Sequence, residues 1–271
     1  MTSYRRRPVA AALLLLGVLG VACGDDNGEE VTEDDPTDDG AVTGSDLDGS
    51  MTVFAAASLT DVFGELGQTF EVANPAASVE FNFASSSSLR EQILNGAPAD
   101  VFASANESNM DGVVDAGEAT GQQMIFAHNQ LQIAVSPGNP AGVTGLADFG
   151  DADLLIGLCD EEVPCGEFAR EALANAGVDP SIDTNEPDVR SLLTKIEVGE
   201  LDAGIVYRSD VLASGGGVEG IDIPADQNVT ASYPIVVLAA ADDSDLAQAF
   251  VNAVLSQQGR EILASYGFDP A

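Results

Sequence analysis

Four places in this sequence are predicted to present the amino-terminal end of a helix. A β-prone run leads through Ser58, predicted as a helix N-cap, into an apolar helical pattern, and a second leads through a serine run that includes Ser86. The other two helix starts lie around Cys165 and Val189. The first N–H groups of a helix have no partner within the helix, so such turns attract anions. A single serine at such a turn is usually a plain cap. Four matched turns instead predict an anion site made of hydroxyls and backbone N–H groups.

Positive charge is scarce in this chain, which limits how an anion is held. The 271 residues contain 45 acids and nine bases, for a formal net charge of −36. Three of the bases are Arg5, Arg6 and Arg7, and the folded part has only Arg90, Arg170, Arg190, Lys195, Arg208 and Arg260. A cluster of cations is therefore not expected at the site. The negative field argues against nucleic acid as a partner and otherwise favours solubility or a salty habitat.

The amino-terminal segment has the pattern of an export signal. Residues 1–23 combine a basic start with a short apolar run, and they end at Cys23 in a pattern that resembles a bacterial lipoprotein signal. We expect Cys23 to be lipidated, the alternative being an ordinary signal peptide with an incidental cysteine. Residues 24–50 contain eleven acids and almost no large apolar side chains, so they are predicted to form a disordered acidic tether.

From residue 51 onward, apolar strand patterns alternate with helical ones. This alternation predicts an α/β fold with two lobes, each a mainly parallel sheet flanked by helices. The predicted elements include strands 51–56, 78–83, 131–136 and 203–207 and helices 59–73, 167–176 and 187–198. In such sheets the strand-to-helix turns lie at the carboxyl ends of the strands, so the ligand cleft is expected between the lobes.

The candidate site combines hydrogen-bond donors with few charges. A set of donors without a free acceptor suits an anion that carries no proton. Asp61 and Asp188 are interpreted as first-turn acids favoured by the helix dipole. Arg190 and Arg208 are expected to pair with surface acids and not with the ligand. Tyr207 ends an apolar strand, and taken alone it is typical of a core residue whose hydroxyl lies at the edge of the core.

Seven motifs occur in a characteristic order between residues 51 and 271. They are Phe54–Thr60, Phe83–Ser87, Gly96–Phe102, Val163–Gly166, Asp188–Arg190, Gly204–Tyr207 and Tyr266–Phe268. In this respect the chain resembles the bacterial periplasmic molybdate-binding proteins. The resemblance implies a type II periplasmic-binding-protein fold, with one lobe made of residues 51–132 and 234–271 and the other of residues 133–233.

The resemblance also implies a function and a set of ligand contacts. The chain would capture molybdate, and equally tungstate, and deliver it to the permease and ATPase subunits of an ABC importer. It would work as a monomer outside the cytoplasm, without catalytic activity or a cofactor, held to the membrane by its lipid. Carried over by position, the oxyanion contacts are the hydroxyls of Ser58, Ser86 and Tyr207 and the backbone N–H groups of Cys165 and Val189.

One position departs from the family pattern, which often has alanine where this chain has Cys165. Cys159 and Cys165 lie on either side of a predicted loop in a protein that is expected to be exported. We predict that they form a disulfide. Two free thiols, or a metal site that also uses Asp160, are the alternatives.

Three other functions stay open at this point. The ligand could be another tetrahedral oxyanion such as sulfate. A secreted serine hydrolase would need the sole histidine, His128, but the sequence has no Gly-x-Ser-x-Gly turn, and His128 is also typical of a surface position at the start of a strand. A structural lipoprotein without a small ligand is the third alternative.

Overall fold

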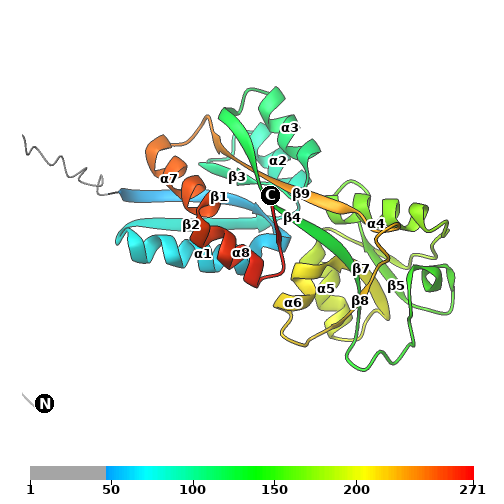
Figure 1. Ribbon diagram of the computed structural model, residues 1–271. Helices are drawn as coiled ribbons and strands as arrows, with labels where there is room; N and C mark the ends of the chain where they lie inside the picture. Colours follow the sequence, from blue (N-terminus) through cyan, green and yellow to red (C-terminus); the bar gives the residue numbers. More distant parts are fainter. Residues whose placement is uncertain (1–46) are drawn as a thin grey trace, which may run out of the picture. The chain divides into compact units, whose positions relative to one another are not determined.

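The computed structural model describes residues 47–271, in which strands and helices alternate (Figure 1). The predicted signal, Cys23 and most of the predicted tether lie outside the described residues. The last three tether residues, 48–50, instead belong to the first strand, β1 (Asp48–Ala56). They extend the parallel pairing of β1 with its neighbour from Ala56 back to Asp48. Backbone pairing explains this extension, since it needs no apolar side chains.

The first lobe is built on a sheet with the order β2-β1-β3-β9-β4. Its other strands are β2 (Ala76–Ala84), β3 (Val101–Ala103), β4 (Ala119–Val135), β9 (Thr230–Leu238) and β10 (Asp269–Pro270), which pairs with β4. Its helices are α1 (Thr60–Ala73), α2 (Ser86–Leu94), α3 (Glu107–Asp115), α7 (Ser244–Leu255) and α8 (Gln257–Ser265). A 3-10 turn, η1 (Ala57–Leu59), lies between β1 and α1.

The second lobe is built on a sheet with the order β4-β7-β5-β6. Its strands besides β4 are β5 (Ile156–Cys159), β6 (Thr184–Glu186), β7 (Ala203–Tyr207) and β8 (Glu219–Asp222), which pairs with β4. Its helices are α4 (Pro164–Asn175), α5 (Val189–Glu197) and α6 (Arg208–Ala213), and the 3-10 turn η2 (Leu146–Gly150) precedes β5. The predicted two-lobed α/β fold is therefore confirmed.

Strand β4 belongs to both sheets. It pairs with β9 as far as Gln130 and with β7 from Leu131 onward, and both pairings are antiparallel. The expected parallel pairing therefore holds only in the outer groups, β2-β1-β3 and β6-β5-β7, and both sheets are mixed. The sequence predicted only the end of β4, because residues 119–130 contain one short apolar run, 124–127, between polar stretches.

Aromatic packing fixes helix α1, and with it the η1 turn, against the first sheet. The Phe63 ring lies 5.7 Å from that of Phe126 and 6.1 Å from that of Phe250, measured between centroids. The predicted apolar stripe of the helix is buried and consists of Leu59, Val62, Phe63, Leu66 and Phe70. Each such side chain contributes about 1.5–3 kcal/mol when fully buried. The turn that carries Ser58 is thus anchored at both ends.

The helix starts of the second lobe differ from their predicted positions. Helix α4 begins at Pro164, so Cys165 lies in its first turn and not in a loop. Helix α5 begins at Val189 and not at Pro187, because the Asp188 carboxylate accepts from the Ser191 N–H and caps the helix there. Strand β6 and helix α6 are too short to leave a periodic pattern and were not predicted.

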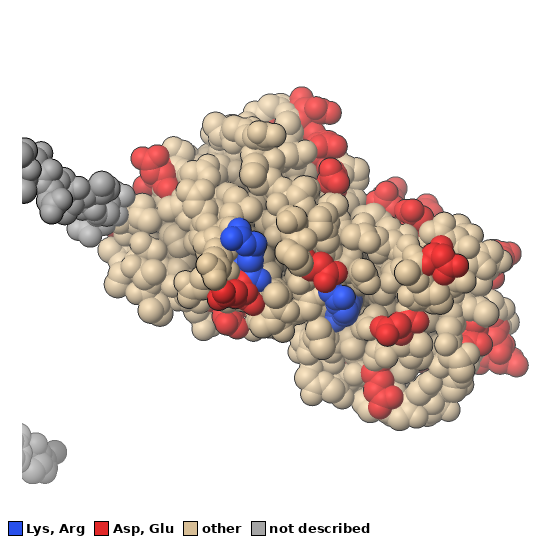
Figure 2. Space-filling model, viewed as in Figure 1, with Lys and Arg blue, Asp and Glu red and all other residues tan. Residues whose placement is uncertain are grey.

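Acidic side chains are scattered over the face of the molecule drawn in Figure 2, where basic ones are few. This distribution fits the interpretation of the acidity as a solvated surface. Among residues 47–271, no helix is both long and apolar enough to cross a membrane.

Candidate anion-binding site

A small pocket lies where the helix starts of the two lobes meet. Its volume is about 20 Å³, and its wall consists of Ala56, Ala57, Ser58, Ser85, Ser86, Ala105, Pro164, Cys165, Asp188, Val189 and Tyr207. Adding the radius of a water-sized sphere gives a cavity of roughly 3 Å radius. That size suits a small oxyanion and is too small for a sugar or a peptide. The structure thus brings all five predicted contact residues into one pocket.

Ser58 enters the pocket from the η1 turn. It is not the N-cap that the sequence predicted, because the 3-10 turn occupies that place and no side chain caps α1. Its hydroxyl is instead 2.9 Å from the hydroxyl of Tyr233, on strand β9. Both residues are buried. The position of the Ser58 hydroxyl therefore depends on a tyrosine that lies far away in the sequence.

Ser86 is the first residue of α2 and is 1% exposed. The capping role belongs to its neighbour Ser85, whose hydroxyl accepts from the Ser88 N–H. The Ser86 hydroxyl accepts a hydrogen bond of 2.9 Å from the Ala105 N–H, in the loop after β3. Ser86 is thus free of helix capping and held by a backbone group from another segment.

Cys165 and Val189 line the pocket at the starts of α4 and α5. Cys165 follows Pro164, the first helical residue, and Val189 follows the capping residue Asp188. N–H groups in a first helical turn have no acceptor within the helix. At both positions the backbone can therefore donate to an anion, and the helix dipole favours that contact.

Tyr207 supplies a hydroxyl from the end of β7. The residue is 1% exposed, and its Oη has no hydrogen-bond partner in the structure. Burial, together with the nearby Tyr233 and Asp210, raises the pKa of Tyr207 well above its ordinary value, so the phenol stays protonated. A buried donor without a partner is costly, at about 1–3 kcal/mol. Tyr207 therefore has an unused proton beside the pocket.

The pocket wall contains one charged residue, the acid Asp188. Within residues 47–271, no Lys or Arg lines it. Arg190 lies 2.8 Å from Asp61, and Arg208 lies 2.9 Å from Asp269. Both arginines thus pair with acids, as predicted. The carboxylate of Asp188 is the only one in the pocket wall, and both of its oxygens are used by Ser191.

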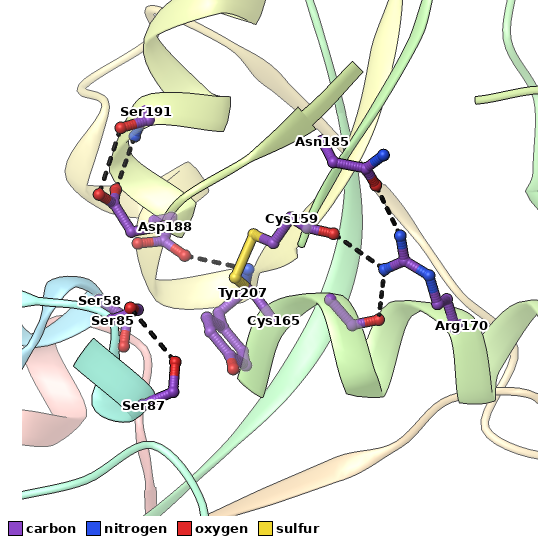
Figure 3. The surroundings of a disulfide bond; sticks show 12 residues. Ser58, Ser85, Ser87, Cys159, Cys165, Arg170, Asn185, Asp188, Ser191 and Tyr207 are labelled. Carbon is purple, nitrogen blue, oxygen red and sulfur yellow. Dashed lines mark hydrogen bonds between the residues drawn. A yellow bond between two sulfur atoms is a disulfide. The ribbon is translucent and has the colours of Figure 1, made fainter. Parts of the chain in front are cut away.

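The predicted disulfide between Cys159 and Cys165 is confirmed, with their Cα atoms 5.8 Å apart. Figure 3 shows it beside Tyr207, where it joins the end of β5 to the first turn of α4. Because these two cysteines are bonded to each other, the alternative of two free thiols is wrong. It also removes both thiolates from the proposed metal site, and no group of three metal-binding side chains occurs among residues 47–271.

The segment closed by the disulfide is held by Arg170, which the sequence did not point to, and by Gly166, which was identified only as part of a motif. Arg170 donates to the carbonyl oxygens of Cys159, at 2.8 Å, and Gly166, at 3.0 Å (Figure 3). A Cβ atom at Gly166 would lie 1.9 Å from the Asp160 carbonyl oxygen, so only glycine fits there. The only indication of this role in the sequence was a single arginine, Arg170, one helical turn after Gly166.

His128 does not serve the pocket serines. It lies on β4, opposite Ser232 of β9, and its Nδ1 is 3.3 Å from the Ser232 hydroxyl. It is absent from the pocket wall. The serine hydrolase alternative lacks its base at this site, since the Ser58 hydroxyl bonds to Tyr233 instead.

Buried polar side chains behind the pocket were also missed. Asn129 donates to the Ser209 hydroxyl at 2.8 Å, which links β4 to α6. Asp210 accepts from the Tyr207 N–H at 3.0 Å, while its other oxygen has no partner. Burial raises the pKa of Asp210 to about 7, against the opposing effects of the Tyr207 N–H and Arg190. No local pattern distinguishes such residues, because their burial depends on the meeting of the two lobes.

The sequence profile of the bacterial extracellular solute-binding proteins matches residues 51–269. This chain belongs to that family. The solute-binding protein is 38% identical over 219 residues to the molybdate-binding protein ModA of Mycobacterium tuberculosis, covering 81% of this chain and 84% of the relative. It is 34% identical over 241 residues to the molybdate-binding protein ModA of Escherichia coli, covering 84% and 93%.

Solved structures support the same fold. The periplasmic molybdate-binding protein of Azotobacter vinelandii superposes with a TM-score of 0.73 at 20% identity, covering 82% of this chain and 99% of the other. The sulfate-binding protein SubI of Mycobacterium tuberculosis superposes with a TM-score of 0.74 at 18% identity, covering 82% and 87%. The solute-binding protein therefore has the fold of periplasmic binding proteins, as predicted.

Proposed function

We propose that this protein captures molybdate, and equally tungstate, outside the cytoplasm and delivers it to an ABC importer. The observation that carries the proposal is the pocket itself. It joins two serines, two helix starts and the partnerless hydroxyl of Tyr207 around a space of oxyanion size. Five charge-assisted hydrogen bonds, each contributing about 1.5–3 kcal/mol, are enough for tight binding without a cation.

The names of the relatives support molybdate as the ligand. Proteins at 38% and 34% identity are molybdate-binding proteins. Sulfate is the second candidate, because a sulfate-binding protein shares the fold and the same donors suit any proton-free tetrahedral dianion. The role proposed for this chain is binding and not catalysis, since the serines lack a base and bond to Tyr233 and Ala105.

We further propose that the two lobes close over the anion about the β4 and β9 strands. The pairing of β4 changes between Gln130 and Leu131, and β9 begins at Thr230, close to the predicted lobe limits of 51–132 plus 234–271 and 133–233. Two contacts join the lobes beside the pocket. They are the Asp61–Arg190 pair and a 3.0 Å hydrogen bond from Asn106 to Glu167.

The chain is proposed to act as a monomer that docks on permease and ATPase subunits, with a lipid on Cys23 as its anchor. Cys23→Ala should move the protein from the membrane fraction to the soluble fraction of cells. A mutant that stays with the membrane would contradict the anchor.

A calorimetric titration of the purified protein with molybdate, tungstate, sulfate and phosphate tests the ligand assignment. We expect molybdate and tungstate to bind with similar affinity. Both should also raise the melting temperature, because by mass action a ligand at a hundredfold excess over Kd raises the free energy of unfolding by about 2.7 kcal/mol. Tyr207→Phe should weaken binding by about 1–3 kcal/mol. Tyr266→Phe is the matched control, since the Tyr266 hydroxyl bonds to Glu65 at the surface. Stabilisation by sulfate but not by molybdate would overturn the assignment.

A further inference from the structure

The two pocket serines differ in what holds their hydroxyl oxygens. A serine hydroxyl has one proton to donate and two lone pairs to accept with. The Ser86 oxygen accepts from the Ala105 N–H, a group that can only donate. The proton of Ser86 is therefore left for another partner, and the pocket lies beside it. Ser86 is thus fixed as a donor toward the ligand by the backbone.

The corresponding contact of Ser58 is not fixed by the backbone. Its oxygen lies 2.9 Å from the hydroxyl of Tyr233, and either oxygen is chemically able to donate. If Ser58 donated to Tyr233, its lone pairs would face the anion and repel it. If Tyr233 donated to Ser58, the Ser58 proton would be free to point at the anion. The direction of this one hydrogen bond decides whether Ser58 attracts or repels the ligand.

We propose that Tyr233 is a positioning residue that donates to Ser58 and so holds the Ser58 hydroxyl as a donor to the anion. This inference rests on the proposed function. Tyr233 is fully buried, and its ring packs edge-on against Tyr207, Phe126 and Phe268 at centroid distances of 6.0, 6.1 and 5.4 Å. These rings hold the phenol in place behind Ser58. Burial also raises the pKa of Tyr233, which keeps its proton available.

The consequence for specificity is the loss of two acceptors from the pocket. With Ser58 and Ser86 both turned to donate, a ligand that carries a proton finds no serine oxygen at these positions to receive it. The Asp188 carboxylate accepts from the N–H and the hydroxyl of Ser191 at the start of α5. Hydrogen phosphate is therefore disfavoured relative to molybdate and sulfate, which carry no proton. Without the Tyr233 hydroxyl, Ser58 is free to rotate and accept.

The test is Tyr233→Phe, which keeps the ring and removes only the hydroxyl. Titrations with molybdate and with inorganic phosphate at mildly alkaline pH give the ratio of the two affinities. We expect molybdate affinity to fall about two- to tenfold, as for the loss of one neutral hydrogen bond, and phosphate affinity to stay constant or rise. Tyr266→Phe, which removes a surface hydroxyl from the same lobe, should leave both affinities unchanged.

A tyrosine that only fills the core would lower both affinities in proportion, and an unchanged ratio in Tyr233→Phe would overturn the proposal. If the wild-type protein binds none of the oxyanions, the proposed function fails instead. Should the variant not fold, NMR of wild-type protein with ¹³C-labelled tyrosine and serine decides the point. We expect the bridging proton to couple to Cζ of Tyr233, and coupling to Cβ of Ser58 would refute the assignment.

Discussion

The two walls of the pocket use different kinds of donor. The first lobe offers side-chain hydroxyls, Ser58 and Ser86, and each needs a second group to direct its proton. Besides the hydroxyl of Tyr207, the second lobe offers backbone N–H groups at Cys165 and Val189, whose direction is set by the helices that they start. The first wall therefore depends on residue type, and the second, apart from Tyr207, depends on residue placement.

This difference explains why the backbone around Cys165, in the second lobe, is held by several local contacts. Because residue 165 contacts the anion through its backbone N–H, its side chain has no part in that contact. Here the side chain forms a disulfide. The backbone around it is tightly held, by Arg170 on two carbonyl groups and by a glycine at 166 that no larger residue can replace. We infer that a backbone N–H is positioned accurately toward the ligand only when the segment that carries it is rigid.

The largest expected effect comes from removing a backbone donor without disturbing its helix. Proline is well tolerated at the first position of a helix, so Val189→Pro should keep α5 and delete only the N–H. Binding of molybdate should weaken by about 1.5–3 kcal/mol, the contribution of a hydrogen bond to a charged group. Isothermal titration calorimetry measures the change.

Val189→Ala is the matched control for that variant. Val189 is buried, so both substitutions lose its packing, but only proline loses the N–H. The alanine variant should therefore bind with nearly wild-type affinity. Equal losses in the two variants would show that the second wall depends on its side chain after all.

A smaller effect is expected from loosening the segment that holds the other backbone donor. In the double variant Cys159→Ser and Cys165→Ser, the free energy of unfolding should fall by about 2 kcal/mol, because the closed loop is short. The N–H at position 165 remains, so the affinity should change less than in Val189→Pro. Urea unfolding of the double variant and of the wild-type protein, compared without reductant, is the check. Identical midpoints would argue against a stabilising disulfide.

The smallest effect on ligand affinity is expected from Asp210, which accepts from the Tyr207 N–H and does not line the pocket. Burial raises its pKa from 3.8 to about 7 in the folded protein, so between these values the folded state binds more protons than the unfolded chain. The free energy of unfolding should therefore fall as the pH rises through this window. Asp210→Asn keeps an acceptor for the Tyr207 N–H and removes the titration.

Urea unfolding of both proteins on either side of neutrality tests this linkage. The stability of Asp210→Asn relative to the wild type should increase as the pH rises and level off above the folded-state pKa. A difference that is the same at acid and alkaline pH would mean that Asp210 is ionised throughout.

The local features of the site were largely predictable from the sequence. Strand-to-helix turns with serines identified Ser58 and Ser86, and the scarcity of bases pointed to neutral donors. Helix starts were placed within a few residues, with errors where a short 3-10 turn or the Asp188 cap set the boundary. The two cysteines were paired correctly, since the third cysteine of the chain, Cys23, lies in the predicted signal.

The groups that support the site could not be predicted in this way. Tyr233, Asn129 and Asp210 carry no local pattern, and their roles depend on contacts between distant segments. The hydrogen bond between Ser58 and Tyr233 joins residues 175 positions apart. Strand β4 was predicted only over its last part, because its first part has only one short apolar run between polar stretches and is held by pairing with β9.

By itself, then, the sequence determined the kind of chemistry, because residue types decide which groups can donate and how little positive charge is present. It also determined the alternation of strands and helices, which follows from local apolar patterns. Only the tertiary structure decided that the four helix starts and Tyr207 line one small space, and which groups lie against the hydroxyls of Ser58 and Ser86. Convergence of this kind depends on the shared strand β4 and on burial, which no short stretch of sequence encodes.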